Sequence, residues 1–193
     1  MIQREMYMKR IRPFIGTDLV KVMTGIRRCG KSVMLNLIKD ELKASGVQDA
    51  QMISFNFEVM SNAHLCTAQA LHDEVLKRAA AIAGKVYLFF DEIQEVTDWE
   101  KCINSVRVEM DCDIYITGSN AFFLSGELAT LLTGRYIEQH ILPLSFQEFK
   151  QWHVENNPII QQLSNRDLYA MYIRSSFPYT LAMHSNQETY DYL

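Results

Sequence analysis

Glycine and proline are scarce in this sequence, which has only 8 Gly and 4 Pro among 193 residues. That scarcity excludes long flexible linkers. The longest uninterrupted apolar stretch, residues 86–90, is far shorter than the roughly 20 residues of a membrane-spanning helix. The N-terminal segment mixes charged and apolar residues and lacks the features of a secretory signal. We therefore expect a cytoplasmic protein with no membrane partner.

The cysteines show no metal-site spacing. Cys29, Cys66, Cys102 and Cys112 stand far apart, with no C-x-x-C pair and no histidine at zinc-finger spacing. We expect reduced thiols, as in a cytoplasm.

Charge is distributed unevenly along the chain. The net charge is −4, but residues 1–39 hold nine Lys or Arg and only two acids. Such a segment can attract nucleic acid, or it can hold the phosphates of a bound nucleotide. The acidic total argues against a general nucleic-acid binder and favours the second interpretation. A hydrophobic content of 48% indicates a globular fold with a substantial core.

Strand-like and helical patterns alternate, which is typical of a parallel sheet covered by helices. The expected strands are 20–24, 52–57, 86–90, 114–117 and 136–142, and the expected helices are 31–43, 68–83, 99–109 and 121–132. After Pro143 the pattern is helical or irregular, with no further strand.

One motif stands between the first strand and the first of these helices. It reads Gly25-Ile26-Arg27-Arg28-Cys29-Gly30-Lys31-Ser32, a complete G-x-x-x-x-G-K-[ST], and is followed by Val33. A glycine loop between a strand and a helix can surround a triphosphate with backbone N–H groups. We expect residues 25–33 to bind the nucleotide, with Lys31 on the β- and γ-phosphates and Ser32 on Mg²⁺. Arg27 and Arg28 either contact phosphate or a neighbouring subunit, or are solvated; we favour solvation.

The strand at 86–90 leads into Asp91 and Glu92. The carboxyl end of a buried parallel strand is where ligands bind in open α/β sheets. We expect Asp91 to hold Mg²⁺ and Glu92 to orient and deprotonate the attacking water. No N-K-x-D segment for guanine recognition occurs. A glutamate beside the metal aspartate suits ATP hydrolysis better than a kinase reaction.

Two weaker signals follow. Ser119 and Asn120 stand after the strand at 114–117 and either contact the γ-phosphate and attacking water or cap the next helix. Arg135 precedes the last strand. It either supplies charge to the transition state, in its own site or in a neighbour's, or forms a structural salt bridge.

In this order the motifs resemble those of AAA-type P-loop ATPases. More narrowly, the chain is similar to uncharacterised prokaryotic AAA-like ATP-binding proteins with a G-x-R-R-x-G-K-S loop, a D-E-I-Q Walker B and a T-G-S-N segment. The matches are 25–32, 91–94 and 117–120, followed by 134–149. The resemblance implies an α/β fold with a five-stranded parallel sheet in the order 5-1-4-3-2. It further implies Ser119 as the sensor residue and Arg135 at an arginine-finger position. An arginine that acts on a neighbour's site would require a homo-oligomer.

We expect a P-loop ATPase domain over residues 1–150, with a basic N-terminal helix, and a helical segment over 151–193. The resemblance implies that this segment begins a lid or C-terminal domain. Three functions remain open: an Mg²⁺-dependent ATP hydrolase, a nucleotide-operated switch or scaffold with slow hydrolysis, and a nucleic-acid-handling ATPase. The last would use the basic residues Arg4, Lys9, Arg10 and Arg12.

Overall fold

The fold is built on a five-stranded parallel sheet, seen here in a computed structural model that describes residues 2–119, 132, 134–156, 163–183 and 186–192. The strand order is β2-β3-β4-β1-β5, and all four neighbouring pairs are parallel. The predicted fold class and strand order are therefore confirmed. The strands are β1 (Val20–Thr24), β2 (Met52–Asn56), β3 (Val86–Asp91), β4 (Cys112–Thr117) and β5 (Tyr136–His140).

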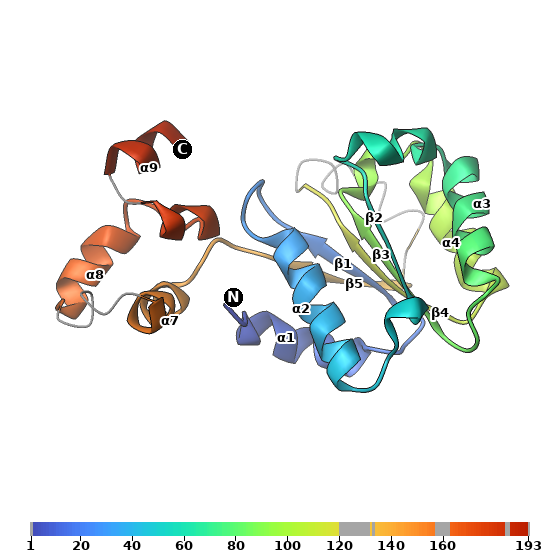
Figure 1. Cartoon of the computed structure of the whole chain (residues 1–193), viewed down its shortest axis with the longest axis horizontal. Helices are drawn as coiled ribbons and strands as arrows, with labels where there is room; N and C mark the ends of the chain where they lie inside the picture. Colours follow the sequence, from blue (N-terminus) through green and yellow to red (C-terminus); the bar gives the residue numbers. More distant parts are fainter. Residues whose placement is uncertain (1, 120–131, 133, 157–162, 184–185, 193) are drawn as a thin grey trace.

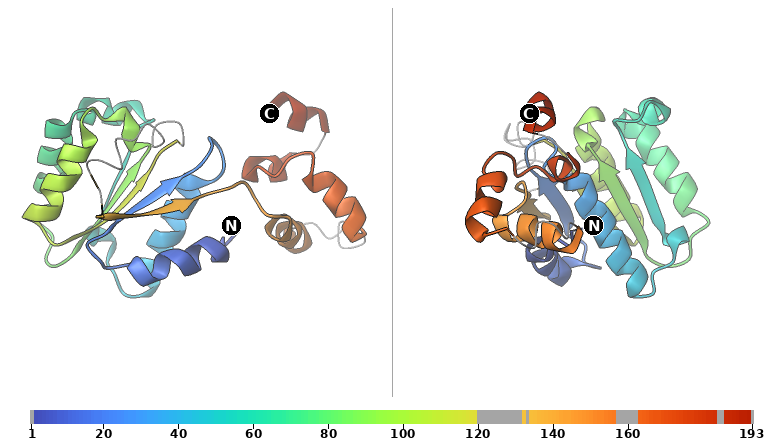
Figure 2. Two further views of the ribbon diagram at one scale, coloured as in Figure 1. Left: turned by 180° about the vertical axis from the view of Figure 1, so that it is seen from behind. Right: turned by 60° about the vertical axis from the view of Figure 1, so that its left-hand side comes forward.

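Helices cover both faces of the sheet (Figures 1 and 2). One face packs against α1 and α2, and the other against α3 and α4. Their bounds are α1 (Glu5–Ile11), α2 (Lys31–Ala44), α3 (Ala68–Ala79) and α4 (Trp99–Glu109). Short 3₁₀ turns occur at Arg12–Phe14, Asp49–Gln51, Met60–Leu65, Ile93–Glu95 and Pro178–Ala182.

Most boundaries agree with the predicted ones to within two residues. The helix predicted over 68–83 ends early, at Ala79, before a turn in which Gly84 has a φ of +85°. The strand predicted over 136–142 ends at His140, where the Leu142 N–H is bonded to the Tyr7 hydroxyl rather than to a strand. The helix predicted over 121–132 lies almost wholly outside the described residues.

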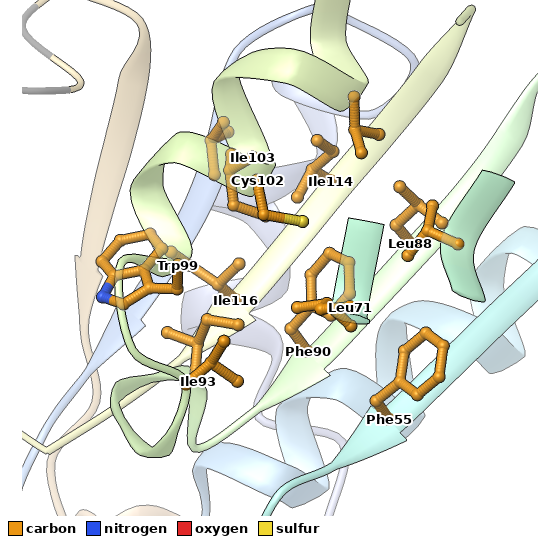
Figure 3. Close-up of a cluster of buried hydrophobic side chains, with 14 of the residues drawn as sticks. Phe55, Leu71, Leu88, Phe90, Ile93, Trp99, Cys102, Ile103, Ile114 and Ile116 are labelled. Carbon is orange, nitrogen blue, oxygen red and sulfur yellow. The ribbon is translucent and has the colours of Figure 1, made fainter. Parts of the chain in front are cut away.

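The larger core fills the space between the sheet and α3 and α4 (Figure 3). Alternate residues of the central strands point to this face, as the two-residue period of a strand requires. Trp99 at the start of α4 is 1% exposed and closes one end of the core. Phe55 and Phe90, on neighbouring strands, stack with ring centroids 5.8 Å apart. Burial raises the pKa of Cys102 to about 12 and that of Cys112 to about 11, so both thiols stay protonated at neutral pH.

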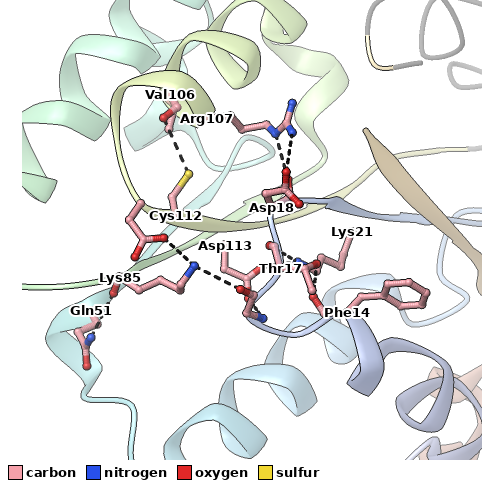
Figure 4. A network of polar contacts seen from close by, with 12 residues as sticks. Phe14, Thr17, Asp18, Lys21, Gln51, Lys85, Val106, Arg107, Cys112 and Asp113 are labelled. Atoms are coloured by element: carbon pink, nitrogen blue, oxygen red, sulfur yellow. Dashed lines mark hydrogen bonds and ion pairs between the residues drawn. The ribbon is translucent and has the colours of Figure 1, made fainter. Parts of the chain in front are cut away.

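A second core lies under α1 and α2. On the same face of the sheet is a network of polar contacts that includes Lys21 and Asp113 (Figure 4). Lys21 of β1 and Asp113 of β4 are 2.5 Å apart and at most 1% exposed. Asp113 also accepts hydrogen bonds from the Tyr115 hydroxyl and from the Gly16 N–H. Buried charges need such partners because their loss of hydration is costly. The network attaches the segment before β1 to the amino end of the sheet.

β5 leads into a group of helices that lies beyond the carboxyl ends of the strands (Figures 1 and 2). A small apolar cluster of Leu144, Phe149 and Leu181 holds this group together. The boundary expected after residue 150 stays a prediction, and α7 crosses it. The helices are α7 (Phe146–Asn156), α8 (Asn165–Tyr172) and α9 (Asn186–Tyr192). Among the described residues, no helix combines the length and apolar character needed to span a bilayer.

Candidate functional site: a phosphate loop facing two carboxylates

The loop at residues 25–30 connects the carboxyl end of β1 to the first turn of α2. Gly25 has a φ of +150°, and a Cβ added there would stand 2.3 Å from the Ile141 carbonyl oxygen. Gly30 has a φ of +104° and precedes the helix directly. Both positions require glycine, because a side chain would meet backbone at the first and be strained at the second. The loop presents backbone amides at the positive end of α2, which is a favourable place for phosphate.

Lys31 reaches back over this loop from the first turn of α2. It is only 4% exposed, and its Nζ lies 3.4 Å from the Gly25 carbonyl oxygen and 3.5 Å from that of Ile26. The same Nζ lies 3.3 Å from Oε1 of Glu92. The lysine of the loop and one of the two predicted carboxylates are therefore in direct contact.

The other carboxylate, Asp91, ends β3 and is 7% exposed. Its Oδ1 accepts a hydrogen bond of 2.5 Å from the Thr117 hydroxyl, and its Oδ2 accepts one of 3.4 Å from the Asn56 amide. The ends of three adjacent strands, β2, β3 and β4, thus meet at one carboxylate. Those two bonds leave Asp91 with acceptor capacity for a cation.

Glu92 is held in an uncommon backbone conformation, with a φ of +55°. Its N–H donates a hydrogen bond of 2.9 Å to the Thr117 hydroxyl oxygen. Its Oε2 accepts a bond of 2.6 Å from the Gln94 amide, while Oε1 contacts Lys31. A left-handed non-glycine residue held by its surroundings is a known mark of functional sites.

Four of these contacts come from three residues that the sequence analysis did not single out: Thr117, Asn56 and Gln94. The T-G-S-N segment directed attention to Ser119 and Asn120 instead. Ser119 is half-buried two residues beyond Thr117, and Asn120 lies outside the described residues. Of this segment, Thr117 is the residue that hydrogen-bonds to the carboxylate end of β3.

The remaining loop residues divide into an exposed tip and a buried base. Ile26, Arg27 and Arg28 are exposed, and Arg27 pairs with Glu58 at 3.2 Å. Cys29 is fully buried, and burial raises the pKa of its thiol. That thiol therefore does not act as a nucleophile at neutral pH.

Arg135 lies at the opposite end of the sheet from the phosphate loop. It directly precedes β5, whose first residue pairs with Val20 at the start of β1. The five residues of β1 separate this end from the loop, a distance of about 16 Å at roughly 3.3 Å per residue. Within one copy of the chain, Arg135 is thus distant from Lys31. Its action on a neighbouring copy stays a prediction.

A mainly apolar cavity of about 150 Å³ adjoins the loop. It lies between the N-terminal segment, the start of α2 and the C-terminal helices. Its mainly apolar lining suits an apolar group with few polar edges, such as a nucleobase. The lining residues are Ile2, Arg4, Gly30, Val33, Leu144, Trp152, Pro178 and Leu181.

The donor groups fit Mg²⁺ better than a transition metal. Ser32 is exposed in the first turn of α2 and supplies a hydroxyl, and Asp91 supplies a carboxylate. Hard oxygen ligands of this kind, few in number and completed by phosphate and water, are typical of Mg²⁺ sites. Within the part of the chain that the structure describes, no cluster of three or more His, Cys, Asp or Glu could hold a metal by itself.

Comparisons with known proteins bear on the family and the fold of the chain. An uncharacterized protein of Haemophilus influenzae is 42% identical over 172 residues, which are 89% of this chain and 42% of that protein. This chain thus spans less than half the length of the curated relative it matches.

Among solved structures, the RuvB Holliday junction branch migration motor of Thermotoga maritima shows the same fold. Its TM-score is 0.62 at 15% identity, with 92% of this chain and 59% of that chain covered. AMPPCP-bound DnaA from Aquifex aeolicus gives a TM-score of 0.58 at 13% identity, with 92% and 57% covered. A family model described as an AAA domain matches residues 17–150. Because that model covers more than half of the sequence, the chain belongs to the AAA domain family.

Proposed function

We propose that this chain binds ATP with Mg²⁺ and hydrolyses it. Membership of the AAA family supports a nucleotide-binding, ATPase-like function. The observation that carries the proposal is the contact between Lys31 and Glu92, with Asp91 adjacent to Glu92 at the end of β3. That contact joins the phosphate loop to the carboxylates that a water-activating ATPase requires.

In this proposal the loop amides and Lys31 bind the β- and γ-phosphates. Ser32 and Asp91 would hold Mg²⁺, which neutralises charge on the phosphate oxygens. The apolar cavity beside Gly30 and Val33 would receive the base. Lys31 and Ser32 act from the first turn of α2, and Asp91 acts from the end of β3.

Glu92 acts as general base toward the attacking water. Phosphate oxygens compete with Glu92 for Lys31, so nucleotide binding releases Oε1 of Glu92. The bond from Gln94 to Oε2 and the bond from the Glu92 N–H to Thr117 keep the carboxylate in place after that release. A carboxylate held in this way can orient a water and accept its proton.

The test is phosphate release from Mg²⁺-ATP by the wild type and three variants. Glu92→Gln should retain nucleotide binding and lose turnover by about 100-fold or more, the usual contribution of a general base. Lys31→Ala should lose binding. Glu95→Gln, at an exposed glutamate three residues further on, is the matched control and should behave as the wild type. Unchanged turnover in Glu92→Gln would contradict the assignment of the base.

The alternative of a nucleotide-operated switch is separated by the same assay. Wild-type turnover at the level of the uncatalysed reaction, with nucleotide binding intact, would favour the switch, whereas measurable wild-type turnover that persists in Glu92→Gln contradicts the assignment of the base.

The alternative of a nucleic-acid-handling ATPase receives less support from the basic N-terminal residues. Arg4 is buried, and Arg12 pairs with Glu5 and Glu41. Of the four residues named for that role, only Lys9 and Arg10 are exposed and have no salt-bridge partner among the described residues.

A further inference from the structure

Arg4 is a buried arginine that lines the cavity beside the phosphate loop and to which the proposed chemistry gives no further role. It directly precedes α1, is only 3% exposed, and has a left-handed backbone with a φ of +48°. A guanidinium withdrawn from water needs several acceptors to offset its lost hydration. A non-glycine residue in the left-handed region is also unusual unless its surroundings hold it there.

Arg4 has two hydrogen-bond acceptors and one ion-pair partner, which come from three separate parts of the chain. Nη1 donates to the Cys29 carbonyl oxygen in the phosphate loop at 3.2 Å. Nη2 donates to the Leu142 carbonyl oxygen after β5 at 2.7 Å. Nε lies 2.9 Å from Oε1 of Glu148 in α7. The Tyr7 ring, with its centroid 4.8 Å from the guanidinium carbon, packs against the same group.

The contact with Cys29 constrains the phosphate loop itself. The Cys29 carbonyl and the Gly30 N–H belong to one planar peptide and point in opposite directions. Because Arg4 holds that carbonyl on its own side, the Gly30 N–H is directed away from Arg4. Gly30 is the last residue before α2, so its N–H is one of the amides available to a phosphate at the helix start.

The contact with Glu148 extends the constraint to the C-terminal helices. Oε2 of Glu148 accepts bonds from the Ser145 N–H and hydroxyl, at 2.8 Å and 2.9 Å, at the start of α7. One oxygen of Glu148 therefore caps α7 while the other pairs with Arg4. The phosphate loop and the first turn of α7 are joined through a single guanidinium.

We propose that Arg4 is a positioning residue that fixes the Cys29–Gly30 peptide for phosphate binding and couples occupancy of the loop to the position of α7. This inference rests on the proposed nucleotide binding. It adds a chain of contacts that connects the phosphate loop to the C-terminal helices. An arginine suits the role because its planar guanidinium supplies N–H donors in fixed directions. A lysine ammonium cannot contact the two carbonyls and the Glu148 carboxylate in the same geometry.

The test uses a fluorescent non-hydrolysable ATP analogue for affinity and amide hydrogen exchange in α7 for coupling. In the wild type, binding of the analogue should slow amide hydrogen exchange in the first turns of α7. We call this slowing the α7 response. Arg4→Lys should bind the analogue about tenfold more weakly, as expected for the loss of one charge-assisted hydrogen bond, and should lose the α7 response. Arg10→Lys is the matched control, at an exposed arginine of the same helix, and should behave as the wild type.

Glu148→Gln separates the two halves of the inference. It leaves Arg4 on the Cys29 carbonyl, so affinity should stay within about twofold of the wild type, while the α7 response should be lost. If the circular dichroism spectrum shows that Arg4→Lys is not folded, Glu148→Gln alone tests the coupling. A wild-type α7 response in Glu148→Gln would overturn the coupling.

Wild-type affinity and a wild-type α7 response in a folded Arg4→Lys protein would overturn the inference while leaving the proposed function standing. A wild-type chain that binds no nucleotide would instead remove the proposed function, and this inference with it.

Discussion

The ammonium of Lys31 lies 3.3 Å from a carboxylate oxygen of Glu92, and both side chains are largely buried. One of these groups is expected to bind phosphate and the other to activate water. Their ion pair means that phosphate has to compete with Glu92 for the lysine.

A first prediction follows from this competition. Glu92→Gln should bind ATP more tightly than the wild type, by about fivefold or ~1 kcal/mol, because phosphate no longer competes with a carboxylate for Lys31. The same substitution also removes a negative charge next to the γ-phosphate. Titration of a fluorescent ATP analogue measures the effect. Weaker binding than in the wild type would show that Glu92 does not restrain Lys31.

A second prediction concerns Thr117, whose hydroxyl joins Asp91 to the backbone of Glu92. Thr117→Val keeps the shape and removes both bonds. It should lower the free energy of unfolding by about 1–3 kcal/mol, the cost of leaving buried polar groups unpaired, and should also lower turnover. Thr117→Ser restores a hydroxyl and should recover most of both losses in denaturation and phosphate-release assays. Equal behaviour of the Val and Ser variants would contradict the role of the hydroxyl.

The core of this architecture could be predicted from sequence because it depends on local patterns. Short β-branched and aromatic runs alternate with amphipathic helices, and the glycine loop marks where the first strand ends. Lys31, Asp91 and Glu92 follow from the same reasoning, since the carboxyl ends of parallel strands share one edge of the sheet.

Two features could not be predicted because they depend on register and on long-range packing. Phe90 pairs with Ile116, so the next residues along, Asp91 and Thr117, become neighbours. Nothing in the T-G-S-N segment alone distinguishes that threonine from Ser119. Arg4 in turn resembles a surface cation in sequence, and its burial depends on the distant residue Glu148.

A third prediction tests the close approach at Gly25. Gly25→Ala would place a Cβ 2.3 Å from the Ile141 carbonyl oxygen, whereas Gly46→Ala, also at positive φ, meets nothing within 4 Å. The control should cost about 1–2 kcal/mol in conformational strain. Gly25→Ala should cost a further ~1–3 kcal/mol for forced displacement of packed backbone. Urea denaturation of both variants gives the difference, and equal losses would mean that the loop tolerates a side chain at residue 25.

A fourth prediction concerns pH and His153 in α7. Its ring packs against Phe149 and Trp152, with centroids 4.4 Å and 4.9 Å away, and burial lowers its pKa from the ordinary 6.5. In the unfolded chain the imidazole takes up a proton as the pH falls through 6.5, while the folded chain resists protonation. The stability contributed by the neutral ring is therefore lost below that pH.

Thermal unfolding at about pH 7.5 and about pH 5.5 measures this loss, which reaches at most about 1.4 kcal/mol per pH unit for one group. The wild type should lose more stability on acidification than His153→Gln, which cannot titrate. His64→Gln, at an exposed histidine, is the control and should follow the wild type. An identical acid loss in His153→Gln and the wild type would exclude His153 as its source.

The central claim is that the phosphate loop and the end of β3 bind one Mg²⁺-nucleotide together. Calorimetric titration with a non-hydrolysable ATP analogue, with and without Mg²⁺, tests it most directly in the wild type, Lys31→Ala and Asp91→Asn. The account predicts that Mg²⁺ strengthens wild-type binding, that Asp91→Asn loses this strengthening, and that Lys31→Ala loses binding altogether. Wild-type binding by Lys31→Ala, or full Mg²⁺ dependence in Asp91→Asn, would contradict it.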